Sequence, residues 1–452
     1  MTMSPATENQ LMIARLLGVD EDQAAALLDV RVAVRAGAGT AASFAKELSE
    51  QLERTVALVD DINKADVEVV VGVAPSGAAA KTVYISLDDD GASFSETALL
   101  LDNDPDLHGL QIVFAACYAA SYVLGRAIEG LPSPPGDFRL SFSSMGADRA
   151  LLEKPIVLAE TALAGAGAVG NGLLRSLRHL DVKGELIVVD PKNIGGGNAN
   201  RCLFFAPGEK GPKAKVLANN AQSSFAHLEF KPFVGAFHDL VQREGRVRQV
   251  LVATDSRPVR RSIQNDLPLV VVDASTTGVN EIIVHSHEQP TEGACLACIY
   301  KHVLDEDAKA KDIASGLGID VSEVDANGLI DDRVAGLIIA AHPGLQKADL
   351  VGKAFDTLFK ELCGQMALLT PAGEQTLAPF AFVSNLAGAY LALEFVRRAA
   401  GVATTNYMFL DPWRPPYTKL RSFRGREPDC PFCRASHTKL AYRMVWPEVS
   451  FE

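Results

Sequence analysis

The chain has 452 residues, which is more than one hydrophobic core usually serves, so we expect two or three domains. Its 48% hydrophobic and 22% charged residues are typical of a globular protein, and its net charge is −13. This acidity argues against a broad nucleic-acid surface, and the apolar stretches are too short or too interrupted to span a membrane.

The first residues, MTMSPATENQ, contain no basic cluster followed by an apolar run, so we expect no signal peptide and a cytoplasmic location. The chain contains seven cysteines. In a cytoplasmic protein these cysteines favour metal binding or thiol chemistry over disulfides.

The N-terminal part has the pattern of a strand, a glycine turn and a helix. We expect a strand at Val30–Val34, a turn at Gly37–Ala42 and a helix at Ser43–Leu52. The segment Val56–Asp60 resembles a second strand ending in an acid, and Ala65–Gly72 is the next predicted strand. The proline-rich segment 131–136 then predicts a linker.

The strongest local signal follows this linker. The apolar run Pro155–Ala164 predicts a strand, and the GAGAVG turn of residues 165–170 leads into a predicted helix, Asn171–Leu180. The next strand, Glu185–Asp190, ends in an acid. Strand, GxGxxG, helix and terminal acid together are typical of a nucleotide phosphate-binding unit, although the turn alone could be purely structural.

Each residue of this unit has an expected role. Gly165 permits the tight turn, Gly167 lets backbone N–H groups approach a phosphate, and Gly170 lets the helix pack closely on the strand. The helix N-terminus adds partial positive charge. Asp190 is expected to accept hydrogen bonds from ribose hydroxyls.

A polar segment rich in Asn, Arg and Lys is inserted after this unit. It contains Asn198, Asn200, Arg201 and Lys213. Fixed cations of this kind suit nucleotidyl transfer, in which negative charge develops on the phosphates and pyrophosphate leaves. Asp255, after the predicted strand at residues 250–254, is expected to hold Mg²⁺, and the alternative is a helix cap.

Two CxxC pairs, Cys295 with Cys298 and Cys430 with Cys433, are the most specific motif in the chain. Four thiolates form a tetrahedral site for structural Zn²⁺, and a pair of disulfides is the alternative. Such a site would tie the C-terminal tail to the segment that follows Gly278.

Three cysteines remain. Cys117 lies in an apolar predicted helix and is expected in the core, and Cys202 follows Arg201, close to the expected nucleotide. Cys363 lies between the first CxxC pair and the last long predicted helix. Its thiolate could accept an acyl group, and simple packing is the alternative.

The two halves of the chain have similar patterns. Besides the two glycine turns, the predicted helices Leu110–Ile128 and Phe382–Ala399 are alike in length and in small residues. We therefore predict an α/β fold with a tandem of two Rossmann-like halves, the first degenerate, and two unrelated α/β domains are the alternative. The predicted domains span 1–135, 136–303, 304–362 (an acidic helical insert) and 363–452.

Taken together, these features resemble the ubiquitin-activating superfamily, including the ThiF, MoeB and HesA adenylyltransferases. The superfamily shares GxGxxG, the ribose acid, Asn-x-Asn-Arg, Lys-Ala, an Asp after the next strand and the paired CxxC. This chain departs from the usual pattern at Cys202 and Ser256. The matching positions are Gly165, Gly167, Gly170, Asp190, Asn198, Asn200, Arg201, Lys213, Asp255 and the four CxxC cysteines.

The resemblance implies further roles. The first half looks like the inactive adenylation domain of such enzymes, from which an arginine reaches the ATP site, and Arg15 is the candidate. Cys363 matches the order of the thioester-forming cysteine. A compact chain with both halves looks like bacterial activating enzymes of ubiquitin-like conjugation operons, some linked to phage defence.

The implied function is ATP-dependent adenylation of the C-terminal carboxylate of a ubiquitin-like protein, followed by thioester formation and transfer to a conjugating enzyme. The expected cofactors are ATP, Mg²⁺ and Zn²⁺. The expected state is a monomer or a homodimer without nucleic-acid or membrane partners. The alternatives are a sulfur-carrier or peptide adenylyltransferase without a thioester, an NAD-dependent dehydrogenase and a non-catalytic scaffold.

Overall fold

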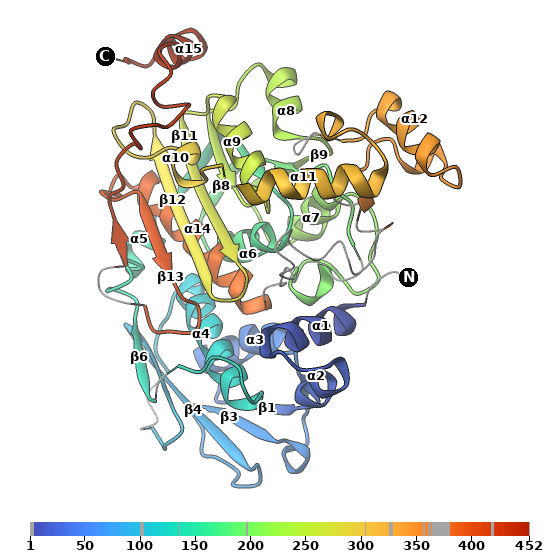
Figure 1. Ribbon diagram of the computed structural model, residues 1–452. Helices are drawn as coiled ribbons and strands as arrows, with labels where there is room; N and C mark the ends of the chain where they lie inside the picture. The colour runs from blue at the N-terminus through green and yellow to red at the C-terminus, as the bar shows by residue number, and fades with distance from the viewer. Residues whose placement is uncertain are drawn as a thin grey trace.

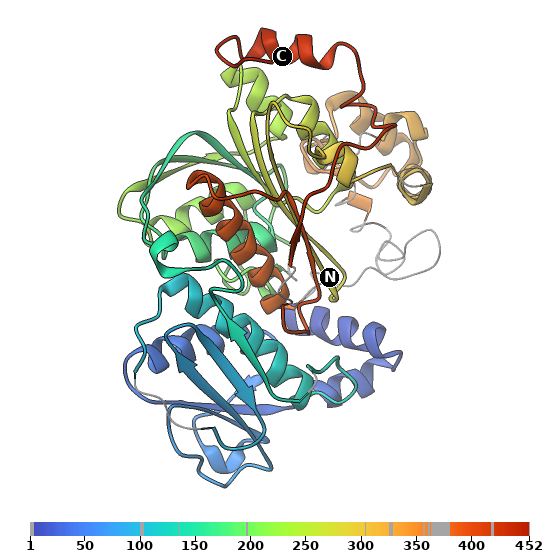
Figure 2. The ribbon, with the colours of Figure 1, turned by 90° about the vertical axis from the view of Figure 1, so that its left-hand side faces the viewer.

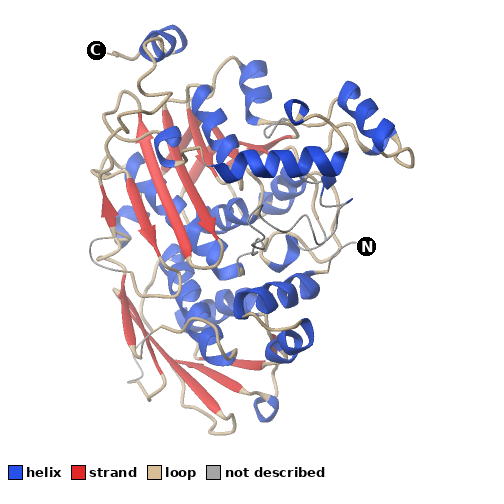
Figure 3. Cartoon of the chain, viewed as in Figure 1, coloured by secondary structure: helices blue, strands red, loops and turns tan. Residues whose placement is uncertain are grey.

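Two β-sheets, one from each half of the chain, flank a layer of helices in the computed structural model (Figure 1, Figure 3). The first sheet and its helices lie at the bottom of Figure 1, and the larger sheet lies above them. The structure describes residues 4–99, 104–134, 136–195, 198–302, 304–324, 329–355, 358–359, 362, 380–416 and 420–451.

Six strands of the described residues form the first sheet, in the order β2-β1-β3-β4-β5-β6. The first four strands in this order run parallel, and β5 and β6 are antiparallel. β3 is VEVVV and buried at every position, which is typical of a central parallel strand covered on both faces. The strands are β1 Arg31–Ala36, β2 Ala57–Leu58, β3 Val67–Val71, β4 Lys81–Asp88, β5 Gly91–Ser95 and β6 Phe138–Ser141.

The first sheet extends beyond the domain boundary predicted at residue 135. β6 pairs with β5 inside that sheet, so the proline-rich segment 131–136 connects two elements of one sheet and does not separate two domains. Arg126 holds the segment against the end of α4 by donating to the backbone oxygens of Pro134 and Gly136. The helix α4 ends at Ala127, before these prolines, and the strand that follows them returns to the first sheet.

Eight strands of the described residues form the second sheet, in the order β14-β13-β12-β11-β10-β7-β8-β9. The strands β7 to β11 are parallel, and the last three are antiparallel. They are β7 Ile156–Ala164, β8 Val182–Val189, β9 Leu228–Phe233, β10 Gln249–Val252, β11 Val270–Thr277, β12 Glu281–Glu288, β13 Tyr407–Leu410 and β14 Arg421–Ser422. The predicted mixed α/β class with a Rossmann-like domain is confirmed.

The four helices whose bounds the sequence predicted correspond to α3, α4, α6 and α14, with ends shifted by a few residues. The helix after the glycine turn begins at Ala168 because Gly167 is already its N-cap. The α-helices are α1 Pro5–Leu17, α2 Glu21–Leu28, α3 Thr40–Leu52, α4 Gly109–Ala127, α5 Arg149–Leu152, α6 Ala168–Leu177, α7 Lys213–Gln222, α8 Phe237–Glu244, α9 Arg257–Asn265, α10 Leu296–Ile299, α11 Leu304–Leu317, α12 Asp332–Ala341, α14 Ala381–Ala399 and α15 Thr438–Val445. Short 3₁₀ turns lie at Ile62–Lys64, Asn198–Asn200, Val321–Glu323 and Lys347–Asp349.

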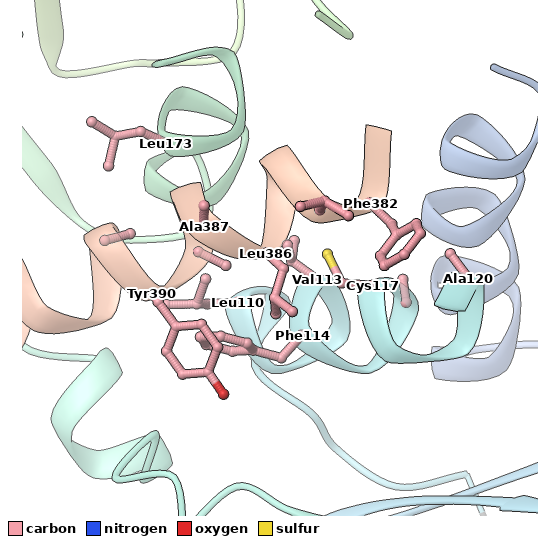
Figure 4. Close-up of a cluster of buried hydrophobic side chains, with 14 of the residues drawn as sticks. Leu110, Val113, Phe114, Cys117, Ala120, Leu173, Phe382, Leu386, Ala387 and Tyr390 are labelled. Carbon is pink, nitrogen blue, oxygen red and sulfur yellow. The ribbon is translucent and has the colours of Figure 1, made fainter. Parts of the chain in front are cut away.

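The long helices α4 and α14 pack between the two sheets and bring the halves into one hydrophobic core (Figure 2, Figure 4). Figure 4 shows Phe114 of α4 beside Tyr390 of α14, and their ring centroids are 4.8 Å apart. The hydroxyl groups of Tyr118 and Tyr390 are 2.9 Å apart and buried. α4 is long and apolar enough to cross a membrane, but 78% of its apolar window is buried, so it is a core helix here.

The segment after the first CxxC pair contains α11 and α12 and forms a small helical unit. The sequence had indicated a helical insert in this segment. It has its own apolar cluster, separate from the main core. Figure 1 shows this unit beside the second sheet, away from the first. The cluster consists of Ile313, Leu317, Ile330, Val334, Ala335, Ile338, Leu350, Phe355 and Leu358.

Candidate functional site

The candidate site lies at the carboxyl ends of three parallel strands of the second sheet. β7 lies between β8 and β10, so the chain winds away from β7 in two opposite directions. In open α/β sheets this reversal leaves a crevice at the carboxyl edge where ligands bind. The glycine turn follows β7, Asp190 follows β8, and Asp255 follows β10.

The three glycines of the turn meet different surroundings. Gly165 has φ +110°, and a Cβ there would lie 2.6 Å from the oxygen of Ala253 on the neighbouring strand end. A Cβ on Gly170 would lie 2.2 Å from the oxygen of Gly165. A Cβ on Gly167 would meet nothing within 4 Å. Two glycines are therefore required by packing, and the third faces open space at the N-terminus of α6, where an anion is favoured.

Asp190 is buried, and its carboxylate accepts hydrogen bonds that fix the backbone of the glycine turn. One carboxylate oxygen accepts the Ala166 backbone N–H at 2.8 Å, and the other accepts the Lys192 N–H at 2.8 Å. Each oxygen keeps a second lone pair for a ribose hydroxyl. The carboxylate thus shapes the turn besides its predicted role toward a ribose.

Asn171 ties the glycine turn to the polar insert, a link that the motif analysis missed. Its buried side-chain amide donates to the oxygen of Gly167 at 2.9 Å, and its Oδ1 accepts the Phe204 N–H at 3.0 Å. An Asn directly after GxGxxG was the available signal, because a buried amide must find partners.

The segment of Asn198, Asn200 and Arg201 lies against α1 of the first half. The Asn198 side chain accepts the Gly195 N–H at 2.8 Å and closes a local turn. Arg201 Nη1 donates to Glu8 at 2.6 Å and to the side-chain oxygen of Asn200 at 2.7 Å. Long-range contacts between the two halves therefore position this motif.

Lys213 is the first residue of α7, and its backbone N–H donates to the oxygen of Lys192 at 2.9 Å. Lys192 Nζ lies 3.4 Å from Asp255, whose side chain is 74% exposed. Ser256 caps α9 by accepting the Val259 N–H, so the alternative role of Asp255 as that helix cap is wrong. Sequence analysis missed Lys192, although its place two residues after Asp190 brings it to the same strand end.

Cys202, next to Arg201, is buried. Burial raises the pKa of its thiol, and Arg201 and Lys213 oppose this rise while Glu8 and Asp190 add to it. A buried thiol with a raised pKa is a packing group. Cys117 lies fully buried on α4, as predicted, and burial also raises the pKa of its thiol.

The four cysteines of the CxxC pairs converge on one point. Their sulfurs all lie within 4.8 Å of one another, and the Cys295 sulfur is 3.7 Å from that of Cys298 and 3.8 Å from that of Cys430. A tetrahedral site with Zn–S bonds of about 2.3 Å requires sulfur separations of about 3.8 Å. The donor set therefore fits Zn²⁺, and all four cysteines are free of disulfides.

Arg15 and Cys363 are the remaining predicted residues. Arg15 lies on α1, two turns after Glu8, where burial lowers the pKa of its guanidinium and Glu8 and Glu21 oppose the change. Arg15 thus shares a helix with the partner of Arg201. Cys363 lies outside the described residues.

Family models cover both halves of the chain. A model described as the E1 N-terminal domain matches residues 2–148, and a model described as the ThiF family matches residues 143–432. The two matches meet a few residues after β6, which agrees with the extended first sheet.

Individual proteins and solved structures share low sequence identity with this chain. An uncharacterised protein of Sinorhizobium fredii, y4jF, is 28% identical over 397 residues, which are 80% of this chain and 74% of that protein. Structures of E. coli MccB, one with ATP and one with MccA-N7isoASN, are 13% identical with a TM-score of 0.36 and cover 63% of this chain and 68% of theirs.

Proposed function

Because this chain belongs to the ThiF family of E1-like adenylyltransferases, we propose that it activates the C-terminal carboxylate of a ubiquitin-like protein with ATP. Adenylation implies ATP as the substrate. The observation that carries the proposal is the open space at Gly167, at the N-terminus of α6, beside the strand ends that Asp190 and Asp255 follow.

The proposed chemistry is an in-line displacement at the α-phosphorus. An oxygen of the carboxylate forms the new bond, the bond to the bridging oxygen breaks, and pyrophosphate leaves with its electrons. A carboxylate is already ionised near neutral pH, so this step requires no general base. The guanidinium of Arg201 and the ammonium of Lys213 would stabilise the charge that develops on the phosphates.

Asp255 would hold a Mg²⁺ ion, since its carboxylate is mostly exposed at a strand end and Mg²⁺ prefers a carboxylate together with phosphate oxygens. When bound, the ion neutralises part of the triphosphate charge. Lys192 lies beside Asp255 and would exchange this carboxylate for a phosphate oxygen.

We propose that the first half is a degenerate relative of the second. β1 lies between β2 and β3 as β7 lies between β8 and β10, and a glycine turn and a helix follow each. Asp104 accepts the Thr40 N–H at 2.8 Å at the N-terminus of α3 and fills the space beside Gly39. A carboxylate of the protein thus lies where a phosphate would lie in an active half. This supports the proposal of one nucleotide site per chain.

The later steps are also part of the proposal. A thiolate at Cys363 would attack the carbonyl carbon of the acyl-adenylate and release AMP, and a conjugating enzyme would then take the acyl group. The cytoplasm, where ATP is abundant, is the proposed location. Because the chain resembles bacterial activating enzymes of ubiquitin-like conjugation operons, some of which are linked to phage defence, we also propose an antiviral role.

ATP–pyrophosphate exchange with a ubiquitin-like carrier tests the first step. Arg201→Ala, Lys213→Ala and Asp255→Ala are each expected to lower exchange by about 100-fold or more, because each removes charge stabilisation. Lys183→Ala is the matched control, since Lys183 lies near the opposite end of β8. Full exchange in both Arg201→Ala and Lys213→Ala would refute the site.

The thioester step needs a separate readout. Cys363→Ala is expected to leave exchange intact and to abolish a carrier adduct that thiol reductants release. Exchange without any such adduct on the unaltered enzyme would support activation of a sulfur carrier or a peptide instead.

A further inference from the structure

Among the described residues, Arg201 is held through one nitrogen, Nη1. Its Nη1 donates to Glu8 of α1 at 2.6 Å and to Asn200 at 2.7 Å, and the Arg201 side chain is 18% exposed. Within the described residues its Nε and Nη2 make no hydrogen bond. A guanidinium fixed at one nitrogen keeps the opposite edge of its fork available for two oxygens of a phosphate.

The backbone beneath Arg201 is held by the same helix. The buried side chain of Asn9, next to Glu8, accepts the side-chain amide of Asn200 at 3.0 Å and donates to the oxygen of Arg54 at 2.5 Å. Arg54 in turn donates to the oxygen of Ala199 at 2.9 Å. Two neighbouring residues of α1, together with Arg54, two residues after the end of α3, thus hold the motif of the second half.

We propose that Glu8 is a positioning residue for Arg201, so that the first half completes the adenylation site of the same chain. This inference rests on the proposed function. Glu8 does not touch the nucleotide; it fixes the rotamer of the guanidinium before ATP arrives. A cation that is already oriented loses less side-chain entropy when the phosphate charge develops.

Positioning and simple electrostatics make opposite predictions. If Glu8 acted only as a charge, its loss would strengthen binding of the polyanionic ATP, because one repulsive carboxylate would disappear. If it positions Arg201, the hydrogen-bond acceptor matters and the charge matters less, because the Oε1 of glutamine also accepts from Nη1.

Steady-state ATP–pyrophosphate exchange separates these cases. Glu8→Ala is expected to lower kcat by at least about tenfold, with the KM for ATP within about threefold of the unaltered chain. Glu8→Gln is expected to retain at least about half of kcat, since it keeps the acceptor. Asp22→Asn, an exposed carboxylate on α2, is the matched control and should leave both constants unchanged.

A double variant tests whether Glu8 acts through Arg201. In the Arg201→Ala background, Glu8→Ala is expected to change the residual exchange by less than about twofold, because the group that it positions is absent. A tenfold further loss there would overturn the inference, as would an unchanged kcat for Glu8→Ala alone. Absence of exchange in the unaltered chain would instead refute the proposed function. Circular dichroism melting of each variant identifies a loss of rate caused by unfolding.

Discussion

At the scale of single residues, several titratable groups are kept neutral by burial. Burial and, to a smaller extent, the charge of Arg178 lower the pKa of His179 to about 3. The His179 ring accepts the Arg178 Nε–H at 3.3 Å, which requires an unprotonated nitrogen. His285 and His287, on β12, are also buried, and burial lowers the pKa of both.

The pH dependence of stability follows from His179. Its folded pKa is below the ordinary value of 6.5, so its contribution is fully present above pH 6.5 and is lost as the pH falls toward 3. The free energy of unfolding should decrease by about 1.4 kcal/mol per pH unit from this group. Urea unfolding at pH 7 to 4.5 should give a flatter slope for His179→Gln, and an identical slope would contradict the assignment.

At the scale of elements, the helix that carries the glycine turn is fixed by a close crossing. A Cβ on Gly388 of α14 would lie 2.3 Å from the backbone of Gly172 and Leu173 in α6. Backbone at this distance cannot move without shifting α6 and its N-terminus. The crossing therefore connects core packing with the N-terminus of α6 in the candidate site.

Gly388→Ala is expected to lower the free energy of unfolding by about 3 kcal/mol, because the added methyl group overpacks two backbones. Gly336→Ala in α12 is the matched control. A Cβ there would meet nothing within 4 Å, so the same change should raise helix stability by up to about 1 kcal/mol. Equilibrium denaturation of both variants measures the difference, and similar values for the two would contradict the crossing.

The cysteine cluster is the second element-scale feature. It joins α10 and the segment before it to the tail that precedes α15. Purified protein is expected to contain about one Zn²⁺ per chain by elemental analysis. Cys430→Ser should lose the metal and increase hydrogen exchange in the tail, whereas Cys202→Ala should keep it. Normal zinc content in Cys430→Ser would exclude the four-thiolate site.

At the scale of the whole molecule, the two halves share one core and a buried ion pair. Glu47 of α3 accepts from Arg175 of α6 at 2.7 Å and from Arg178, the C-cap residue of α6, at 3.0 Å. The side chains of Glu47 and Arg175 are each 5% exposed. A charge at this depth is strongly destabilising without its partner. The halves should therefore unfold together.

Glu47→Ala is expected to destabilise the chain by about 3 kcal/mol or more, because it leaves Arg175 buried and unpaired. Hydrogen exchange should increase together in β3 and β10, which belong to different sheets. Glu153→Ala, which removes an exposed pair with Arg149, should cost at most about 1 kcal/mol. Faster exchange confined to one sheet would show that the halves unfold independently.

The sequence alone determined the local features. Strand, glycine turn and helix are set by periodicity and by backbone freedom within about twenty residues, so the strand-turn-helix unit around Gly165 and the cysteine pairs could be predicted. Contacts between distant segments were decided only in the folded chain. Three such contacts join segments far apart in sequence. They are the pairing of β6 in the first sheet, the hydrogen bond from Arg201 to Glu8 and the crossing at Gly388. No local pattern encodes these contacts, because each depends on which surfaces the shared core brings together.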